Sequence, residues 1–191
     1  MRRGLDVPAL VEAAAAIADA EGLDGLTLNA VAARVGVKTP SLYSHVDGLP
    51  ALRRLLAIEA ARRLGARFTR AAVGRQGDDA IRAIAAAYRG FAREHPGLYA
   101  ATLAAPPAED VEAARVAAEI VSVVVDVLAG LGLSGDAAVH GARAIRAALH
   151  GFAALEAAGG FGLALPVDDS YALMVDALIA GLRARAPRDA A

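Results

Sequence analysis

The 191-residue chain has no cysteine, no tryptophan and only one lysine, Lys38. Without cysteine it can form neither a disulfide bond nor a thiolate metal site. It also has no run of about 18 uncharged apolar residues, which a membrane-spanning helix requires. Acidic side chains at positions 6, 12 and 19 interrupt the apolar core that a signal peptide would need. We therefore expect a cytoplasmic protein with no membrane partner.

Motifs of catalysis and cofactor binding are also missing. The chain has no G-x-S-x-G elbow, no phosphate-binding glycine loop and no cluster of His, Asp and Glu at metal-ligand spacing. His140 and His150 lie ten residues apart, on different faces of one expected helix, and so do not share a metal ion. We expect no enzyme activity, no metal and no cofactor. The alternative is an all-α enzyme with a diffuse site.

The net charge of −1 is unevenly distributed along the chain. Residues 1–75 carry eleven basic and seven acidic side chains, whereas residues 76–191 carry nine and fourteen. A basic N-terminal part on an acidic body is typical of a nucleic-acid-binding head with a separate partner domain. A chance distribution of surface charge is the alternative.

Helical periodicity and turn signals divide the chain into about nine helices, and no segment alternates long enough to indicate a strand. The expected fold is therefore all-α. Asp168 is the expected N-cap of the last helix, and Ser134 or Asp136 that of the helix before it. In chain order we expect helices at residues 7–21 and 28–35, a short one beginning at Pro40, and then 50–70, 78–94, 98–104, 109–131, 137–158 and 170–185.

Residues 26–52 are the stretch around which the chain is organised. They predict a helix, a tight turn, a second short helix and the start of a longer one. Thr27 is the expected N-cap of the first helix, and Gly36 ends it because glycine adopts a positive φ readily. Thr39 is the expected N-cap of the second helix, with Pro40 at its first position.

Leu42 and Val46, four residues apart, are expected to pack the second helix on the first. The side chains that then face outward are polar or small: Lys38, Thr39, Pro40, Ser41, Ser44 and His45. A short helix that is polar on its free face and cationic at its start fits a DNA major groove.

This segment resembles the DNA-binding domain of TetR/AcrR-type transcriptional regulators. The matching positions are Thr27, Val31, Ala32, Val35, Gly36, Val37, Leu42, Tyr43, His45 and Val46. One departure is Leu49, where the family commonly has a phosphate-binding lysine. That contact is lost, or moved to Arg53 or Arg54. The alternative is a helical interaction protein whose head no longer binds DNA.

The resemblance implies a three-helix helix-turn-helix domain at residues 1–48, a linking helix at 49–75 and an effector-binding, dimerising helical bundle at 76–191. The family's members are ligand-responsive regulators, usually repressors. They bind a near-palindromic operator of double-stranded DNA as homodimers and are released by a small-molecule effector. In this chain the expected base contacts are Lys38, Thr39, Pro40, Ser41 and Ser44. The expected phosphate contacts are Thr27, Tyr43 and His45.

Residues 94–99, 149–152 and 159–162 resemble, more loosely, the C-terminal domain of the subgroup named for a Trp-His-Gly signature. The chain has no tryptophan, but His150 and Gly151 match the other two letters. By analogy the effector-binding candidates are Tyr88, Phe91, Tyr99, His150, Phe152 and Phe161, with simple core filling as the alternative. The dimer-interface candidates are Ala147, Gly151, Ala154, Leu155, Ala158, Leu178 and Leu182, with an ordinary intramolecular core as the alternative.

Overall fold

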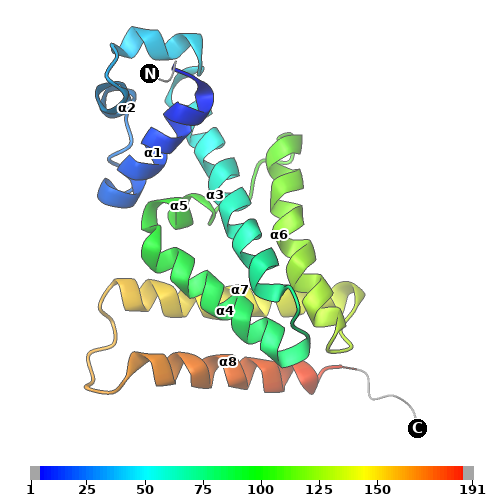
Figure 1. The fold of residues 1–191 in the computed structure, drawn as a ribbon. Helices are drawn as coiled ribbons and strands as arrows, with labels where there is room; N and C mark the ends of the chain where they lie inside the picture. The colour runs from blue at the N-terminus through cyan, green and yellow to red at the C-terminus, as the bar shows by residue number, and fades with distance from the viewer. Residues whose placement is uncertain (1–4, 187–191) are drawn as a thin grey trace. The chain divides into compact units, whose positions relative to one another are not determined.

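The computed structural model describes residues 5–186, and all of the regular elements in that range are helices (Figure 1). The all-α expectation is confirmed. None of the described helices is long and apolar enough to cross a membrane. In chain order the elements are α1 (Val7–Glu21), α2 (Leu28–Val35), the 3₁₀ helix η1 (Thr39–Ser44), α3 (Gly48–Ala72), α4 (Gly77–Glu94), α5 (Pro96–Ala101), α6 (Val111–Ala129), α7 (Gly135–Ala157) and α8 (Val167–Arg183).

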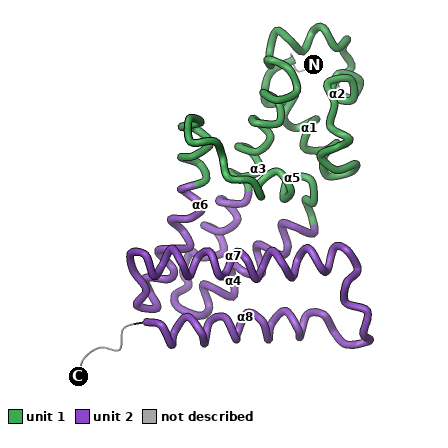
Figure 2. The backbone as a smooth tube through the Cα atoms, turned by 180° about the vertical axis from the view of Figure 1, so that it is seen from behind, with its two compact units in different colours: residues 1–63, 94–117 green, residues 64–93, 118–191 purple. Residues whose placement is uncertain are grey.

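The chain divides into two compact units, which Figure 2 colours separately. The first holds residues 1–63 and 94–117, and the second holds residues 64–93 and 118–191. The first unit therefore contains α5 and the start of α6 in addition to the N-terminal helices. The functional bounds 1–48, 49–75 and 76–191 stay a prediction.

The core of the first unit is built from leucines that are fully buried, among them Leu10, Leu26, Leu42 and Leu52. Helix α1 packs against both α2 and α5. Its approach to α5 requires a glycine at position 97. A Cβ atom built there would lie 2.0 Å from the carbonyl carbon of Ala18, far inside van der Waals contact.

Asp19 of α1 fixes the start of α5. Its carboxylate accepts hydrogen bonds from the backbone N–H groups of Gly97 and Leu98, both at 2.9 Å, and lies 2.9 Å from Nδ1 of His95. These bonds satisfy N–H groups that have no partner within the helix. The short helix therefore begins at Pro96, two residues earlier than the sequence predicts.

The second unit contains α4, α7 and α8 with the ends of α3 and α6. Helices α7 and α8 run antiparallel beside each other (Figures 1 and 2). Arg89 of α4 joins both helices: its guanidinium lies 2.5 Å from Glu156 at the end of α7 and 2.8 Å from Asp168 at the start of α8. The expectation that Asp168 is an N-cap is therefore wrong. Pro166 precedes the helix, and the carboxylate in its first turn binds Arg89.

Candidate nucleic-acid interface

The turn between α2 and η1 follows the local signals of the sequence. The Oγ1 atom of Thr27 accepts a hydrogen bond from the N–H of Ala30 at 3.1 Å, so Thr27 is the N-cap of α2 as predicted. Gly36 ends the helix at a φ of 74°, in the left-handed region that glycine adopts at least cost. The two elements of the motif are thus joined by a turn that the sequence itself specifies.

The second element of the motif is a six-residue 3₁₀ helix and not an α-helix. Its N–H groups bond to carbonyls three residues back, as from Ser41 to Lys38 and from His45 to Leu42, both at 2.9 Å. Such tight helices occur in short pieces. Leu42 and Val46 are buried beneath it, as predicted.

Thr39 does not cap η1, which corrects the expectation from the sequence. The N-cap position is held by Lys38, whose side chain forms no capping bond. The hydroxyl of Thr39 donates instead to Oδ1 of Asn29 at 2.8 Å. This bond places the start of η1 beside the first turn of α2.

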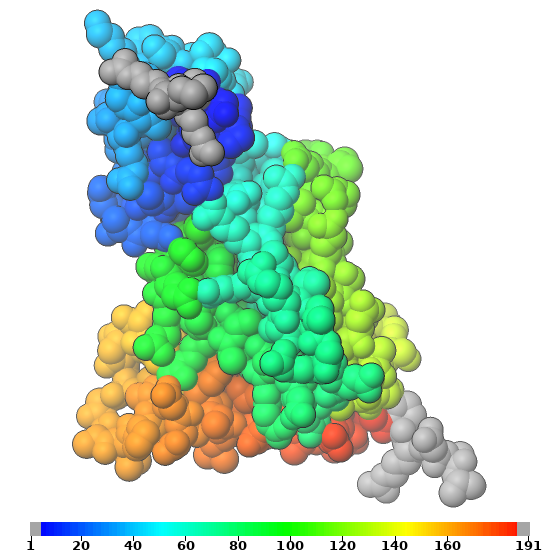
Figure 3. Space-filling model, viewed as in Figure 1, coloured from blue at the N-terminus to red at the C-terminus, as the bar shows by residue number. Residues whose placement is uncertain are grey.

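Seven of the eight residues predicted to bind DNA belong to the segment around residue 40, which lies at the surface of the first unit (Figure 3). Tyr43 is 61% exposed, although its ring is apolar. Thr39 and His45 are half-buried, and the remaining members are exposed: Thr27, Lys38, Pro40, Ser41 and Ser44. The structure therefore brings all eight residues to α2 and η1 and leaves most of them accessible to a partner.

The arginines suggested as substitutes for the missing lysine at position 49 have other partners. Arg53 donates to the backbone carbonyl of Leu23 at 3.1 Å. Arg54 forms ion pairs with Asp110 and Glu112. The guanidinium of Arg54 is therefore engaged by acidic groups, whereas Arg53 is exposed and uses one of its five N–H groups in its bond.

Arg34 is a candidate that the sequence analysis missed. Residues 5–48 contain two cationic side chains, Arg34 and Lys38, and both are exposed. Within the described residues neither side chain forms an ion pair. Arg34 lies in the last turn of α2, immediately before the turn of the motif. The scarcity of cations in this stretch was the signal that could have identified it.

The six predicted effector-binding residues do not fall in one compact unit. Tyr99 belongs to the first unit and the other five to the second. Tyr88, Phe91 and Phe152 are buried, His150 is half-buried, and Phe161 is 36% exposed on the loop that follows α7. Their role stays a prediction.

Arg89 and Tyr171 form an aromatic and ionic cluster that the sequence analysis also missed. The ring of Phe152 lies 4.7 Å from that of Phe161 and 4.9 Å from that of Tyr171. The guanidinium of Arg89 stacks over Tyr171 at 4.6 Å, and its hydrogen bonds lower the pKa of Glu156. Burial raises the pKa of Tyr171, whose hydroxyl donates to the carbonyl of Ala85 at 2.6 Å.

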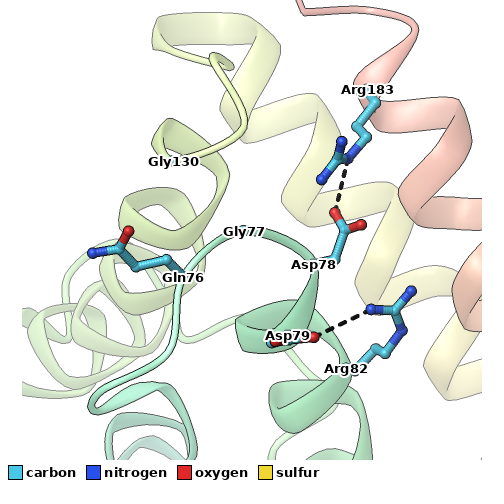
Figure 4. A pocket seen from close by; sticks show the side chains of 7 residues that line it. All are labelled: Gln76, Gly77, Asp78, Asp79, Arg82, Gly130 and Arg183. Atoms are coloured by element: carbon cyan, nitrogen blue, oxygen red, sulfur yellow. Dashed lines mark hydrogen bonds and ion pairs between the residues drawn. The ribbon is translucent and has the colours of Figure 1, made fainter.

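A surface hollow of about 450 Å³ lies in the second unit, at the start of α4 (Figure 4). The charged groups that line it are mutually paired. Arg183 lies 2.9 Å from Asp78, and Arg82 lies 3.4 Å from Asp79. None of the predicted effector-binding residues lines this hollow.

The residues predicted for a dimer interface fall into two groups. Those on α7 and at its end face solvent: Ala147, Gly151, Ala154, Leu155 and Ala158. On α8, Leu178 is half-buried and Leu182 is only 9% exposed. A Cβ atom built on Gly141 would lie 3.2 Å from Leu182, which places Leu182 in the core of its own chain.

Two family models match this chain. The model described as "Bacterial regulatory proteins, tetR family" matches residues 10–45, which include α2 and η1. The model described as "Tetracyclin repressor-like, C-terminal domain" matches residues 81–178.

Two bacterial relatives resemble the chain over most of its length. The HTH-type transcriptional regulator Rv0681 of Mycobacterium tuberculosis, itself uncharacterized, is 38% identical over 177 residues, which cover 92% of this chain and 81% of the relative. The similarly uncharacterized regulator YobS of Bacillus subtilis is 35% identical over 182 residues, which cover 95% and 94%. Both are described as transcriptional regulators and not as enzymes.

A solved structure shares the fold. It is a TetR variant from Acinetobacter baumannii in complex with minocycline, with a TM-score of 0.73 and 24% identity. The match covers 96% of this chain and 99% of that one.

Proposed function

The chain belongs to the TetR family of bacterial transcriptional regulators, and we propose that it is a homodimeric repressor released from its operator by a small-molecule effector. Its N-terminal part contains the helix-turn-helix DNA-binding domain of that family. The observation that supports this function most directly is the exposed polar face of η1, next to the exposed cations Arg34 and Lys38. We place its action in the cytoplasm, where the operator is.

The reading face combines base and phosphate contacts. Lys38, Thr39, Pro40, Ser41 and Ser44 meet base edges in the major groove, and Thr27, Tyr43 and His45 meet phosphates. We add Arg34 to the phosphate contacts because its exposed guanidinium lies at the end of α2. The hydroxyl of Thr27 accepts the capping bond from Ala30, so its own hydrogen remains able to reach a phosphate oxygen.

The outer faces of α7 and α8 form the proposed dimer interface. Gly151 and Gly181 lie within these helices, and a Cβ atom built on either would meet nothing within 4 Å. Glycine inside a helix is less favourable than alanine by about 0.5–1 kcal/mol, and packing within the chain does not require glycine at either position. Close approach of a second subunit would explain why both positions are glycine. We leave Leu182 out of the interface because it is buried in its own chain.

A two-fold dimer places two recognition elements about one DNA turn apart, roughly 34–36 Å, and so favours a near-palindromic operator. The effector must bind the DNA-incompetent state more tightly, because a ligand indifferent to the two states shifts nothing. The minocycline complex of the Acinetobacter TetR variant supports a small-molecule effector. Tyr88, Phe91, Tyr99, His150, Phe152 and Phe161 remain the proposed effector contacts. The Trp-His-Gly subgroup also stays a prediction.

The test is binding of the purified protein to the intergenic DNA upstream of its own gene, titrated over salt concentration. Phosphate contacts make the logarithm of affinity fall linearly with the logarithm of salt concentration. We expect sequence-selective, salt-sensitive binding of a dimer. Binding no tighter than to random duplexes, by a chain confirmed as a folded dimer, across this and the other promoters of the genome would refute a DNA-reading role.

A further inference from the structure

We propose that Asp110 and Glu112 withhold Arg54 of α3 from DNA phosphates and so suppress binding to nonspecific DNA. All three side chains belong to the first unit, which carries the reading face. The inference rests on the proposed function, because it assigns a specificity role to residues of the DNA-binding unit. In this account the two carboxylates keep the unit's affinity dependent on its base contacts.

The geometry of the pair is that of a bidentate arginine–carboxylate contact. The Nε and Nη2 atoms of Arg54 lie 2.5 and 2.6 Å from the two carboxylate oxygens of Asp110. Nη2 also lies 3.1 Å from Glu112, whose other oxygen accepts from Arg62 at 2.9 Å. Two positive charges therefore face two negative ones, and the planar guanidinium of Arg54 is turned toward the acids.

Asp110 is held in place independently of Arg54. Its Oδ1 atom accepts a hydrogen bond from the N–H of Ala113 at 3.1 Å, in the first turn of α6. The Asp110 side chain is only 12% exposed. The Asp110 carboxylate is charged at neutral pH, and hydrogen bonds from Arg54 hold its pKa below its usual value. The acid is therefore a fixed acceptor to which the flexible arginine is drawn.

Arg54 lies on the part of α3 that follows the recognition segment. Helix α3 begins at Gly48, two residues after the buried Val46, and Arg54 is six residues into it. At 1.5 Å per residue this is about 9 Å along the helix axis. An arginine so close to the reading face would contribute a sequence-independent phosphate contact if it were free, and such contacts raise affinity for all DNA alike.

A purely structural role for the same ion pairs makes the opposite prediction. If the acids served only to fasten α6 to α3, removing them would loosen the DNA-binding unit and weaken binding. If they withhold Arg54, removing them strengthens binding to DNA of any sequence. The direction of the change therefore distinguishes the two roles.

The test uses the full-length double variant Asp110→Asn, Glu112→Gln and a duplex of random sequence, with affinity measured by fluorescence anisotropy over a salt series. Asparagine preserves the cap of α6, because it is as good an N-cap as aspartate. We expect random-duplex affinity to rise about tenfold, and the slope of log affinity against log salt to steepen by about 0.9 for the one phosphate contact that Arg54 gains. Adding Arg54→Ala to the double variant should remove that increase.

Two controls separate release of Arg54 from other effects. The pair Asp24→Asn, Glu109→Gln removes the same charge from exposed positions that do not contact Arg54, and should leave the slope unchanged. The single variant Glu112→Gln keeps the bidentate contact between Asp110 and Arg54 and should leave the slope close to that of the wild type.

The inference is wrong if the double variant binds random DNA with an unchanged or flatter slope, or if the control pair has the same effect. A wild-type chain that binds neither random nor upstream DNA in a salt-dependent way contradicts the proposed function instead. A wild-type chain that binds its operator while the double variant shows no gain contradicts this inference alone.

Discussion

On the reading face, the hydroxyl groups of Thr39 and Ser44 have only some of their hydrogen-bonding roles left for DNA. Thr39 donates its hydrogen to Asn29, and Ser44 donates its hydrogen to the carbonyl of Ser41 at 2.8 Å. In the proposed complex both hydroxyls would therefore meet DNA as acceptors, which suits the amino groups of adenine and cytosine in the major groove. Ser41 has no such internal bond and can act in either role.

Substitutions on this face should separate base reading from phosphate binding. Lys38→Ala and Ser41→Ala should change which sequences bind, by about 1–3 kcal/mol at the affected base pair. Arg34→Ala and Tyr43→Phe should weaken binding to all sequences alike, since phosphates are the same everywhere. Affinities for a panel of single-base operator variants measure both effects. If Tyr43→Phe altered sequence preference alone, the assignment of roles would be wrong.

Tyr171 should make the folded chain less stable as the pH becomes alkaline. Burial raises its pKa in the folded chain, whereas the unfolded chain loses the phenolic proton at about pH 10. The free energy of unfolding should therefore fall as pH rises above about 10, because the unfolded state is then favoured by ionisation. Denaturant titrations between pH 8 and about 11 measure this.

The matched variant is Tyr171→Phe. It should be less stable at neutral pH by about 1 kcal/mol, through loss of the bond to Ala85. Its stability should fall less steeply in alkali than that of the wild type. Parallel curves for the two proteins would show that Tyr171 is not the group responsible.

At the scale of helices, the contact between α1 and α5 depends on the absence of a side chain at position 97. Gly97→Ala places a methyl group against the backbone of Ala18, which is not a flexible neighbour. We expect a loss of about 1–3 kcal/mol or more in the free energy of unfolding. Gly162→Ala is the control: nothing lies within 4 Å of its Cβ position, and it should be neutral or slightly stabilising. If Gly97→Ala were as stable as the wild type, α1 and α5 would have to move apart without an energetic cost.

Arg89 should be the most important ion-pairing residue of α4. Its side chain is 11% exposed and meets two carboxylates, so Arg89→Ala leaves Glu156 without its partner. We expect a loss of about 3 kcal/mol. Arg82→Ala on the same helix breaks pairs that are roughly half-exposed and should cost less than about 1 kcal/mol. Thermal and denaturant unfolding compare the two variants, and similar losses would contradict this ranking.

Local signals account for what the sequence predicted well. Thr27 and Gly36 fix the bounds of α2, as expected, and the predicted helix at residues 7–21 matches α1, which Asp6 caps at its start and Gly22 at its end. The outward-facing residues around η1 also lie within one local motif and follow from helical spacing, whereas Thr27 and Tyr43 were named through the family resemblance and Arg34 was missed. Each of these features depends on neighbours a few residues apart.

The remaining features depend on partners distant in sequence. Thr39 bonds to Asn29 ten residues away, and this contact replaced the capping role expected of it. Arg54 pairs with Asp110, which lies 56 residues away in the sequence. The motif alone therefore could not show that the guanidinium of Arg54 is engaged by an acid. Periodicity cannot reveal such pairs. For the same reason the apolar stripe of the last helix, together with the family analogy, suggested Leu182 as an interface residue. The structure buries Leu182 in its own chain.

For the whole molecule, the proposed assembly depends on the outer surface of α7 and α8. Gly151→Leu adds a large side chain where the structure leaves open space, so a single chain should tolerate it. In a two-fold dimer the added side chains clash twice, and the dissociation constant should rise by at least about 100-fold. Sedimentation velocity should then show a monomer, and the same variant should lose its binding to the operator.

Ala86→Leu serves as the control for that experiment. Ala86 is exposed on α4, outside the proposed interface, and the same increase in side-chain size there should leave both the dimer and operator binding intact. If Gly151→Leu remained a dimer of wild-type affinity, the interface would lie elsewhere on the molecule.

The bonds from Asp19 to the start of α5 have a consequence for building hybrid regulators. A fragment cut after the recognition segment, or after residue 63, would expose Ala18 and leave the Asp19 carboxylate without the N–H groups that it binds. Residues 94–117 belong to the same compact unit and complete it. A chimera that borrows the DNA specificity of this chain for another sensor should therefore carry both pieces, with its junctions after residues 63, 93 and 117.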